Sequence, residues 1–360
     1  MNLKADVCIV GAGPGGALLA YLLAKKNISV ILLERHSSIE KEFRGEHLNA
    51  EGEQVLKKHG LFTNIEELGL LRMEKLEYWN NGQLYKTVLP DKRVGHLGIH
   101  VPQAHLLSVL ISKSQLLPSY TLMTDTRVMD LIEDENGQFI GVKANKSGEE
   151  ITVHSQLIVG ADGRFSTVRK KAEIEVKTKK HGYDLLWAKI PAPDGWEPTI
   201  KMALVNGKQI ALFTQTKGFI QIGWNIDEGA FPQISKQPFE PFINQLIDAF
   251  PQLKETVKSH IQTWRDFVLL DVHSSELPKW GKDGVILIGD AAHTMTPTGA
   301  FGLNCSLKDA DVLAELINKD FIDRLGLLSC ATKRKEEVSK LQAIQIEKEQ
   351  SFASQFVILV

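Results

Sequence analysis

The chain of 360 residues is 43% hydrophobic and 24% charged, and its 42 Lys and Arg nearly balance its 44 Asp and Glu, for a formal net charge of -2. These values are typical of one large or two interlocked globular domains, and they exclude a mini-protein, a collagen, a coiled coil and a disordered tail. Because there is no basic excess, we expect no nucleic acid as partner and no attachment to an anionic membrane. The composition therefore favours a protein that acts on a small molecule.

The cysteines and the chain ends bear on location. Cys8, Cys305 and Cys330 are far apart and lack CxxC spacing, which predicts no metal site and no disulfide framework and fits a reducing compartment. The apolar run at 7–10 reaches glycines at once, unlike a signal peptide, and the apolar end at 356–360 is too short to span a bilayer. We expect a cytoplasmic protein without integral membrane association, either a monomer or a homodimer.

The first elements alternate between strand and helix. The pattern predicts a buried strand over 6–10, a helix over 15–26 and a second apolar strand over 29–33, which together form a βαβ unit with a parallel sheet. Further elements follow in chain order: a helix over 52–60, a hairpin over 76–88 around Asn81-Gly82, a helix over 104–114 and a three-strand meander over 126–159.

A change of pattern between about 180 and 270 predicts a second domain. Alternating strands, with one helix over 241–249, are typical of a half-exposed antiparallel sheet. The parallel-sheet pattern returns at 285–288, followed by a helix near 307–317 and a charged, solvated helix over 333–349 that covers the body of the protein. We therefore predict an α/β (α+β) fold with a discontinuous first domain (1–75, 100–178 and 276–330), an inserted antiparallel-sheet domain (76–99 and 179–275) and a C-terminal helix (331–360).

Gly11, Gly13 and Gly16 form a GxGxxG motif that follows a predicted strand and opens a predicted helix. In this context Gly11 allows a tight turn, Gly13 lets the backbone approach a pyrophosphate, and Gly16 lets the helix pack close to the strand. Glu34 closes the second strand, near the offset of a carboxylate that accepts hydrogen bonds from ribose hydroxyls. Because this contact needs a free 2′-hydroxyl, FAD or NAD fits the site better than NADP.

Two further motifs lie at the C-terminal ends of predicted strands, where ligands bind in parallel sheets. The first is GADGRFSTVR, residues 160–169, and the second is GDAAH, residues 289–293. Their aspartates, Asp162 and Asp290, are suited to accept hydrogen bonds from a polyol, and the amides that begin the following helix are suited to a polar ring edge or a phosphate. The alternative for either aspartate alone is a helix N-cap.

With these residues in order, the chain resembles the FAD-dependent aromatic hydroxylases of the p-hydroxybenzoate hydroxylase type. The resemblance covers most of the chain and rests on GAGPGG with Glu34, on GADGRFSTVR, and on GDAAH followed by Pro297 and Gly302-Leu303-Asn304. It implies a Rossmann-like FAD-binding domain with an inserted substrate-binding domain. It also implies a monooxygenase in which NADH or NADPH reduces FAD, O2 forms a flavin C4a-hydroperoxide, and one oxygen passes to an aromatic or related substrate.

The resemblance further implies which residues contact FAD. The pyrophosphate turn comprises Gly11, Gly13, Pro14, Gly15 and Gly16. Glu34 is implied to lie at the adenosine ribose, and its neighbour Arg35 is a further candidate cofactor-binding residue. Other contacts are implied for Arg44, after the second strand; Gln103, at the phosphate or ribityl chain; Val128, beside the adenine; Asp162, near the pyrophosphate; Gly289 and Asp290, at the ribityl hydroxyls; and the amides of Gly302, Leu303 and Asn304, at the pyrimidine edge. For Arg44 the alternative is a surface arginine.

His47 is the candidate catalytic base that deprotonates a phenol, because it closely follows Arg44 near the expected flavin position. The alternative is a histidine that faces solvent or adjoins a helix cap, and His293 in GDAAH is expected to cap its turn or to pack beneath the flavin. In the second domain Trp187, Phe213 and Trp224 are candidates for an aromatic substrate pocket, or equally for the core.

Other functions remain open. A flavin-dependent halogenase needs a catalytic lysine and a WxWxIP segment, and residues 223–227 (GWNID) lack the second Trp and the Pro. A prenyl reductase of the same superfamily reduces lipid double bonds without O2. A flavin-binding protein without turnover is supported by Ala300 and Phe301, where the chain departs from the family's GQG-like turn. The identity of the substrate and the choice between NADH and NADPH are not fixed by the sequence.

Overall fold

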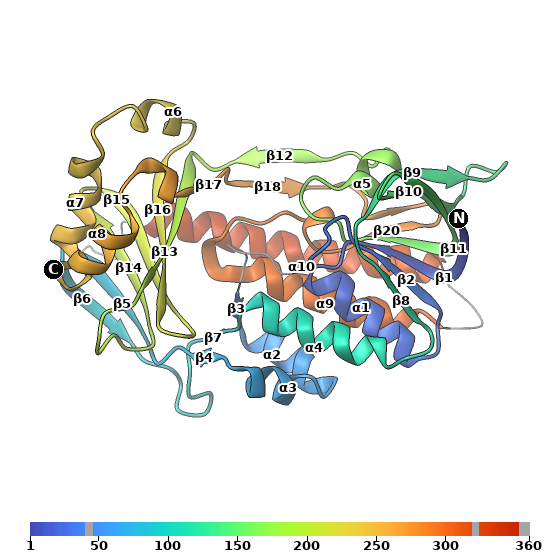
Figure 1. The fold of residues 1–360 in the computed structure, drawn as a ribbon, viewed down its shortest axis with the longest axis horizontal. Helices are drawn as coiled ribbons and strands as arrows, with labels where there is room; N and C mark the ends of the chain where they lie inside the picture. The colour runs from blue at the N-terminus through green and yellow to red at the C-terminus, as the bar shows by residue number, and fades with distance from the viewer. Residues whose placement is uncertain (40–45, 319–323, 353–360) are drawn as a thin grey trace. The chain divides into compact units, whose positions relative to one another are not determined.

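The computed structural model describes residues 1–39, 46–318 and 324–352. By their contacts these residues divide into two compact units, each discontinuous in the sequence and each with its own sheet (Figure 1). The first unit comprises Met1–Leu68, Pro102–Lys179 and Ser274–Gln345. The second unit comprises Gly69–Val101, Lys180–His273 and the chain from Ile346.

A mostly parallel sheet forms the centre of the first unit. Its strands lie in the order β19 (Gly281–Lys282), β20 (Val285–Leu287), β11 (Glu149–Gly160), β1 (Asn2–Val10), β2 (Val30–Leu33) and β8 (Tyr120–Met123), while β10 (Phe139–Lys146) pairs antiparallel with both β11 and β9 (Thr126–Glu133). β1 pairs in parallel with β2 and β11, and its last four residues are buried. The predicted βαβ unit, the meander and the α/β (α+β) fold class are thereby confirmed.

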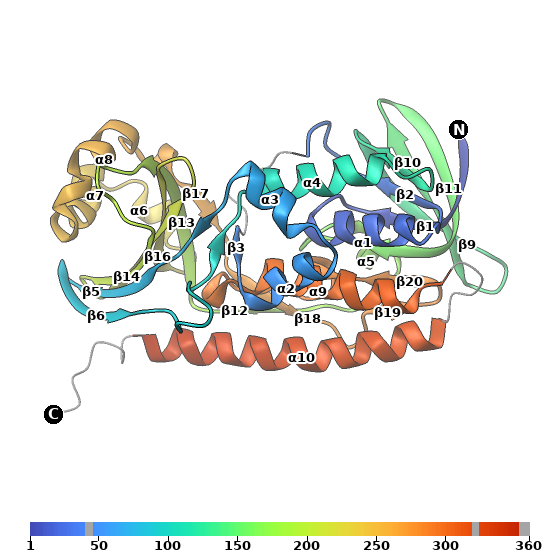
Figure 2. The same cartoon turned by 90° about the horizontal axis from the view of Figure 1, so that it is seen from below.

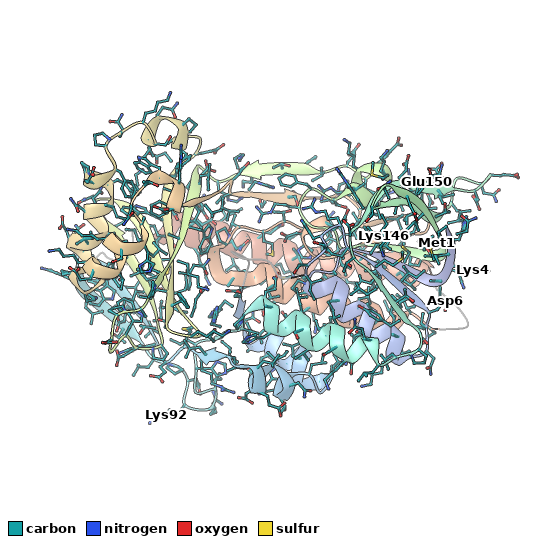
Figure 3. All side chains as sticks on the ribbon, viewed as in Figure 1. Met1, Lys4, Asp6, Lys92, Lys146 and Glu150 are labelled. Carbon is teal, nitrogen blue, oxygen red and sulfur yellow. The ribbon has the colours of Figure 1, made fainter. Side chains whose placement is uncertain are left out.

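The start of β1 is anchored to its neighbours. The N-terminal amine of Met1 donates a 3.0 Å hydrogen bond to the carbonyl oxygen of Glu150, and Figure 3 shows both residues at this end of the sheet. The Asp6 carboxylate accepts hydrogen bonds of 2.8 and 2.7 Å from the backbone amide and the hydroxyl of Ser29. With this register, β1, β2, β11 and β20 end at the same edge of the sheet, where the three sequence motifs follow.

Helix α1 (Pro14–Lys25) begins with a proline, whose missing amide has no intrahelical acceptor to lose, and residues 15–24 are all buried because α4 and α9 pack against it. The other helices that begin in this unit are α2 (Ala50–Lys58), α3 (Phe62–Leu68), α4 (Gln103–Gln115), α5 (Thr167–Lys171), α9 (Phe301–Leu316) and α10 (Arg324–Ser351), together with the 3-10 turns η3 (Gly289–Ala291) and η4 (Thr298–Ala300). Figures 1 and 2 show α10 running beside α9.

One helix starts earlier than predicted, and another is as expected. α9 starts at Phe301, well before the predicted start near 307. Ala300 has a left-handed backbone, which ends the preceding turn, so the helix begins at the next residue. The charged segment 333–349 lies in α10, which covers the first unit with one face, since Val338 and Gln345 are each only 1% exposed. The expectation of a charged helix that covers the body of the protein agrees with the structure.

An antiparallel sheet with one parallel pair forms the second unit. Its strands lie in the order β17 (Val268–Leu270), β13 (Tyr183–Pro191), β16 (Phe219–Asp227), β15 (Lys208–Gln215), β14 (Thr199–Val205), β5 (Lys75–Asn80) and β6 (Gln83–Val88), with β14 and β5 parallel. Side chains alternate between the two faces. One face packs against α7 (Phe239–Ala249) and α8 (Lys254–His260) in a core that includes Leu186, Trp224 and Phe250.

Short elements complete the described chain. They are α6 (Phe231–Ile234), η1 (Pro251–Leu253), η2 (Trp264–Asp266), β3 (His47–Leu48), β4 (Leu71–Arg72) paired with β7 (Ile99–His100), and β12 (Lys177–Lys180) paired with β18 (His273–Glu276). The hairpin predicted around Asn81-Gly82 is confirmed as β5 and β6. Among the described residues, no helix combines the length and apolar character needed to cross a membrane.

Candidate functional site

The glycine-rich turn between β1 and α1 is held by close packing. A Cβ atom on Gly11, whose φ is +104°, would lie 2.4 Å from the carbonyl oxygen of Ala161, and one on Gly16 would lie 2.0 Å from the carbonyl oxygen of Gly11. A Cβ on Gly15 would lie 2.3 Å from the hydroxyl of Ser306. Because non-bonded atoms do not approach so closely, these three positions require glycine or a shift of their neighbours.

Gly13 differs from the other glycines of this turn. A Cβ built on Gly13 would meet no atom within 4 Å. Gly13 is the N-cap of α1, and it provides no side chain to bind the amides of the first turn, which have no intrahelical acceptor. Pro14 follows at the first helical position. The turn thus presents free amides and the positive end of the helix dipole to open space, which fits an anionic group such as a pyrophosphate.

Glu34 follows β2 at the same edge of the sheet and is 3% exposed. Its Oε2 accepts a 3.0 Å hydrogen bond from the backbone amide of Ala12, inside the glycine-rich turn. Its Oε1 accepts a 3.1 Å hydrogen bond from the amide of His36 and lies 2.7 Å from Nδ1 of that ring. The carboxylate is therefore beside the turn, as a ribose contact requires, whereas the neighbouring Arg35 is exposed.

Val128 and Gln103 are both buried, at 5% and 8% exposure. The amide of Thr126 donates a 2.8 Å hydrogen bond to the carbonyl oxygen of Glu34, so Val128 lies on a strand that begins next to Glu34. Gln103 begins α4, and its backbone amide donates a 3.1 Å hydrogen bond to Oε1 of Glu46. Arg44 lies outside the described residues.

Asp162 binds the start of the helix that follows it. Its Oδ2 accepts hydrogen bonds of 2.7 and 3.1 Å from the amides of Thr167 and Val168, and its Oδ1 accepts one of 2.5 Å from the hydroxyl of Ser166. Burial raises the pKa of this carboxyl above its ordinary value, although the hydrogen bonds favour the ionised form. The structure thus gives Asp162 a capping role close beside Gly11, and a cofactor contact of its side chain stays a prediction.

Arg169 joins the second motif to the third. Its guanidinium group donates hydrogen bonds of 2.8 Å to the carbonyl oxygens of Arg164 and Ala291, and the residue is 8% exposed. The neighbouring Asp290 has a side chain that is 37% exposed, with Nε of Arg164 lying 3.8 Å from its Oδ2. The two motifs are therefore adjacent, and the Asp290 carboxylate remains open to a polyol.

Ser306 joins the first motif to the third. A Cβ on Gly289, whose φ is +58°, would lie 2.7 Å from the Ser306 hydroxyl, which also faces Gly15. The amide of Gly289 donates a 2.9 Å hydrogen bond to Oδ2 of Asp309. Ser306 and Asp309 were not predicted from the sequence, because neither belongs to a motif. The available signal is their three-residue spacing on a helix after GDAAH, which places both on one face.

The start of α9 adjoins these motifs. Gly299 and Ala300 both have left-handed backbones, with φ of +75° and +53°, so the chain turns sharply before the helix. The amides of the first turn of α9, which include those of Gly302 and Leu303, have no intrahelical acceptor, and no side chain caps the helix. These amides are suited to bind the acceptor edge of a ring.

Asn304 forms hydrogen bonds that connect the segment around His47 to α9. The Asn304 side chain is 1% exposed, and its Nδ2 donates hydrogen bonds of 3.0 and 2.8 Å to the carbonyl oxygens of His47 and Ala300. Its Oδ1 accepts a 3.0 Å hydrogen bond from the amide of Asn49. His47 is therefore near the start of α9 through its backbone, and the use of its ring as a base stays a prediction.

The three aromatic candidates of the second unit do not share a face. Trp187 pairs with Gly223, and Phe213 pairs with Gln221, so both half-buried rings lie on one face of the sheet. Trp224 lies on the other face, is 1% exposed and stacks on Phe242 with ring centroids 4.0 Å apart. Trp224 is a core residue, and its assignment to the substrate pocket is wrong.

Known proteins with similar sequences and folds bind FAD or act as oxygenases. The model of a family described as FAD binding domain matches residues 4–321. The chain is 30% identical to a 6-methylpretetramide 4-monooxygenase of Streptomyces rimosus, over 95% of this chain and 82% of that protein. It is 28% identical to squalene epoxidase 4 of Arabidopsis thaliana, over 87% of this chain and 62% of that protein.

Among solved structures, PqsL of Pseudomonas aeruginosa in complex with 2-aminobenzoylacetate has a similar fold. The TM-score is 0.82, and the match covers 98% of this chain and 96% of that chain. At 20% identity, this similarity concerns the fold alone.

Proposed function

Because the chain belongs to the FAD binding domain family, we propose that it is an FAD-dependent monooxygenase that uses NADH or NADPH and O2 to hydroxylate an aromatic or related small molecule. When bound, FAD supplies the acceptance of hydride and the activation of O2. The observation that carries the proposal is the meeting of three separate motifs at one sheet edge, with open space at Gly13 and an exposed carboxylate at Asp290.

The residues at this edge match the successive parts of FAD. The free amides around Gly13 suit the pyrophosphate, and the Glu34 carboxylate, beside Ala12, suits the adenosine ribose. Asp290 suits the ribityl hydroxyls because its carboxylate is open. The amides of Gly302 and Leu303 suit the pyrimidine edge, where the positive end of the α9 dipole stabilises negative charge.

An aromatic substrate is supported by two observations. The Streptomyces relative is named as a monooxygenase of 6-methylpretetramide, and the second unit carries two half-buried aromatic rings, Trp187 and Phe213, on the sheet face opposite its helices. We propose that these rings contact the substrate and that His47 accepts a phenolic proton. A larger apolar substrate is the alternative, since a squalene epoxidase is also a relative.

Hydroxylation is favoured over the other flavin reactions. The segment 223–227 lacks the second Trp and the Pro of the halogenase WxWxIP segment, and it lies in β16, where Trp224 is 1% exposed. We propose a cytoplasmic location, because the three cysteines are free thiols, as expected in a reducing compartment. We further propose that the protein is a monomer or a homodimer. Burial raises the pKa of Cys8 and of Cys305 to about 12, so neither is suited to act as a nucleophile.

The test is a screen of phenols, quinolones and polyketide aromatics for stimulation of NADH or NADPH oxidation by purified protein. With a matching compound we expect faster oxidation and incorporation of one labelled oxygen atom from 18O2 into the product. Squalene-like lipids form the parallel arm of the screen. Reduction of a lipid double bond without O2 would support the prenyl reductase, and bound flavin that NAD(P)H never reduces would support a protein without turnover.

A further inference from the structure

One face of α10 carries three polar side chains that point into the first unit. Arg334 and Gln345 are 6% and 1% exposed, Gln342 is half-buried, and the apolar Val338 lies between them at 1% exposure. Their spacing of eight and three residues follows the helical period, so they share a face. The burial of polar groups is costly unless they form hydrogen bonds. The hydrogen-bond partners of these three side chains therefore indicate which segment of the first unit this face of α10 supports.

Gln345 and Gln342 bind the backbone that leads into α9. Nε2 of Gln345 donates hydrogen bonds of 2.8 and 2.5 Å to the carbonyl oxygens of Thr296 and Thr298. Nε2 of Gln342 donates to the carbonyl oxygens of Ser275 and Thr294, at 3.1 and 3.3 Å. Residues 293–297 form neither helix nor strand, so their carbonyl oxygens need such partners from elsewhere in the chain.

Arg334 supports the other end of the same segment through Asp309. Nε of Arg334 donates a 3.0 Å hydrogen bond to Oδ1 of Asp309, while Oδ2 accepts one of 2.9 Å from the amide of Gly289 and lies 2.6 Å from Nε2 of His293. Burial opposes the charge of Asp309, but its three partners hold the pKa of the carboxyl below its ordinary value. The carboxylate is thus ionised and fixes the turn that carries Asp290.

We propose that α10 is a positioning element of the FAD site, in which Arg334, Gln342 and Gln345 hold residues 289–300 in the conformation that binds the cofactor. This segment runs from the turn of Asp290, the proposed ribityl partner, to the start of α9, the proposed pyrimidine partner. The inference rests on the proposed function. It adds that FAD affinity depends on side chains of the C-terminal helix that act through this segment.

The test uses Gln345→Leu, which keeps the approximate volume of the side chain but removes both donors. Gln350→Leu is the matched control, because Gln350 is exposed on the same helix. We expect Gln345→Leu to raise the Kd for FAD of the apoprotein by about fivefold to thirtyfold, since the two hydrogen bonds that Gln345 donates to the segment are lost. It should also shift the reduction midpoint potential of the bound flavin. Gln350→Leu should leave both values unchanged.

Two readouts separate positioning from mere stabilisation. A purely structural role of Gln345 would lower the unfolding temperature of the apoprotein but leave the Kd for FAD, measured well below that temperature, equal to the wild-type value. That result would overturn the inference alone, whereas a wild-type chain that binds no FAD would overturn the proposed function as well. If Gln345→Leu does not fold, Gln342→Leu, at a less buried position, provides the same comparison.

Discussion

The glycine-rich turn after β1 and the segment from Gly289 to Asn304 lie at the same edge of the sheet but obtain their shapes differently. The turn follows from backbone contacts inside or next to one βαβ unit, as at Gly11 and Gly16. The second segment depends on side chains from later helices, such as Asp309 and Gln345. A short motif can therefore specify a turn mainly through steric contacts of the backbone, whereas an irregular segment needs partners that only the folded chain supplies.

The largest effect should come from Asp309→Asn. The substitution leaves the Arg334 guanidinium, whose side chain is 7% exposed, without its buried carboxylate, and we expect a loss of about 3–5 kcal/mol in the free energy of unfolding. Urea unfolding of the apoprotein measures it. Asp311→Asn on the same helix should cost less, because its partner Lys58 is 46% exposed. Equal losses would show that the buried Asp309–Arg334 pair stabilises the segment from Gly289 to Asn304 no more than the exposed Asp311–Lys58 pair does.

Acid should remove the same contribution from the wild-type protein. The pKa of the Asp309 carboxyl is lowered in the folded chain from an ordinary value of 3.8, so its stabilisation is present above that value and is lost as the pH falls through the folded pKa. We therefore expect the stability difference between wild type and Asp309→Asn to shrink below about pH 4. A difference that grows in acid would contradict the ionised pair.

The pair Gly16→Ala and Gly13→Ala tests the steric account of the turn. A Cβ at position 16 overlaps a backbone oxygen, and we expect a loss of about 1–3 kcal/mol in the free energy of unfolding. A Cβ at position 13 meets open space, so Gly13→Ala should lose at most about 1 kcal/mol of helix capping. It should nevertheless weaken FAD binding, because the methyl group occupies the expected place of the pyrophosphate. Greater destabilisation by Gly13→Ala would contradict this account.

Asp290→Ala should weaken FAD binding without unfolding the protein. A hydrogen bond to a charged group contributes about 1.5–3 kcal/mol, which corresponds to roughly tenfold to hundredfold in Kd. Titration of the apoprotein with FAD measures this change, and the exposed Asp248→Ala serves as the control for loss of a surface charge. An unchanged Kd would place Asp290 outside the cofactor site.

The smallest effect should come from Ala300→Gly. Ala300 has a φ of +53°, a left-handed conformation that costs a residue with a Cβ roughly 1 kcal/mol. Glycine removes this strain but adds freedom to the unfolded chain, so we expect a gain of less than about 1 kcal/mol in the free energy of unfolding. Calorimetric unfolding measures it. A loss of stability would mean that the methyl group of Ala300 contributes packing that outweighs the strain.

The sequence predicts the parts of the site that obey local rules. The glycines, Glu34 and Asp290 could be identified because each follows a buried strand at a position where parallel sheets bind ligands. For Trp224 a signal was available, because Trp224 shares one face of its strand with Ile220, Ile222 and Ile226, whereas the other face is mostly polar or glycine. This alternation indicates a core position. The buried role of Gln345 was hidden because a polar residue on a charged helix resembles a solvated one.

The most direct test of the account is the identification of the cofactor that purified protein releases on heat or acid precipitation. We expect about one FAD per chain, bound noncovalently and recovered in the supernatant, with a smaller amount retained by Gly13→Ala. Release of FMN or NAD, or failure of the apoprotein to bind added FAD, would contradict the assignment of the glycine-rich turn, Glu34 and Asp290 to one FAD site.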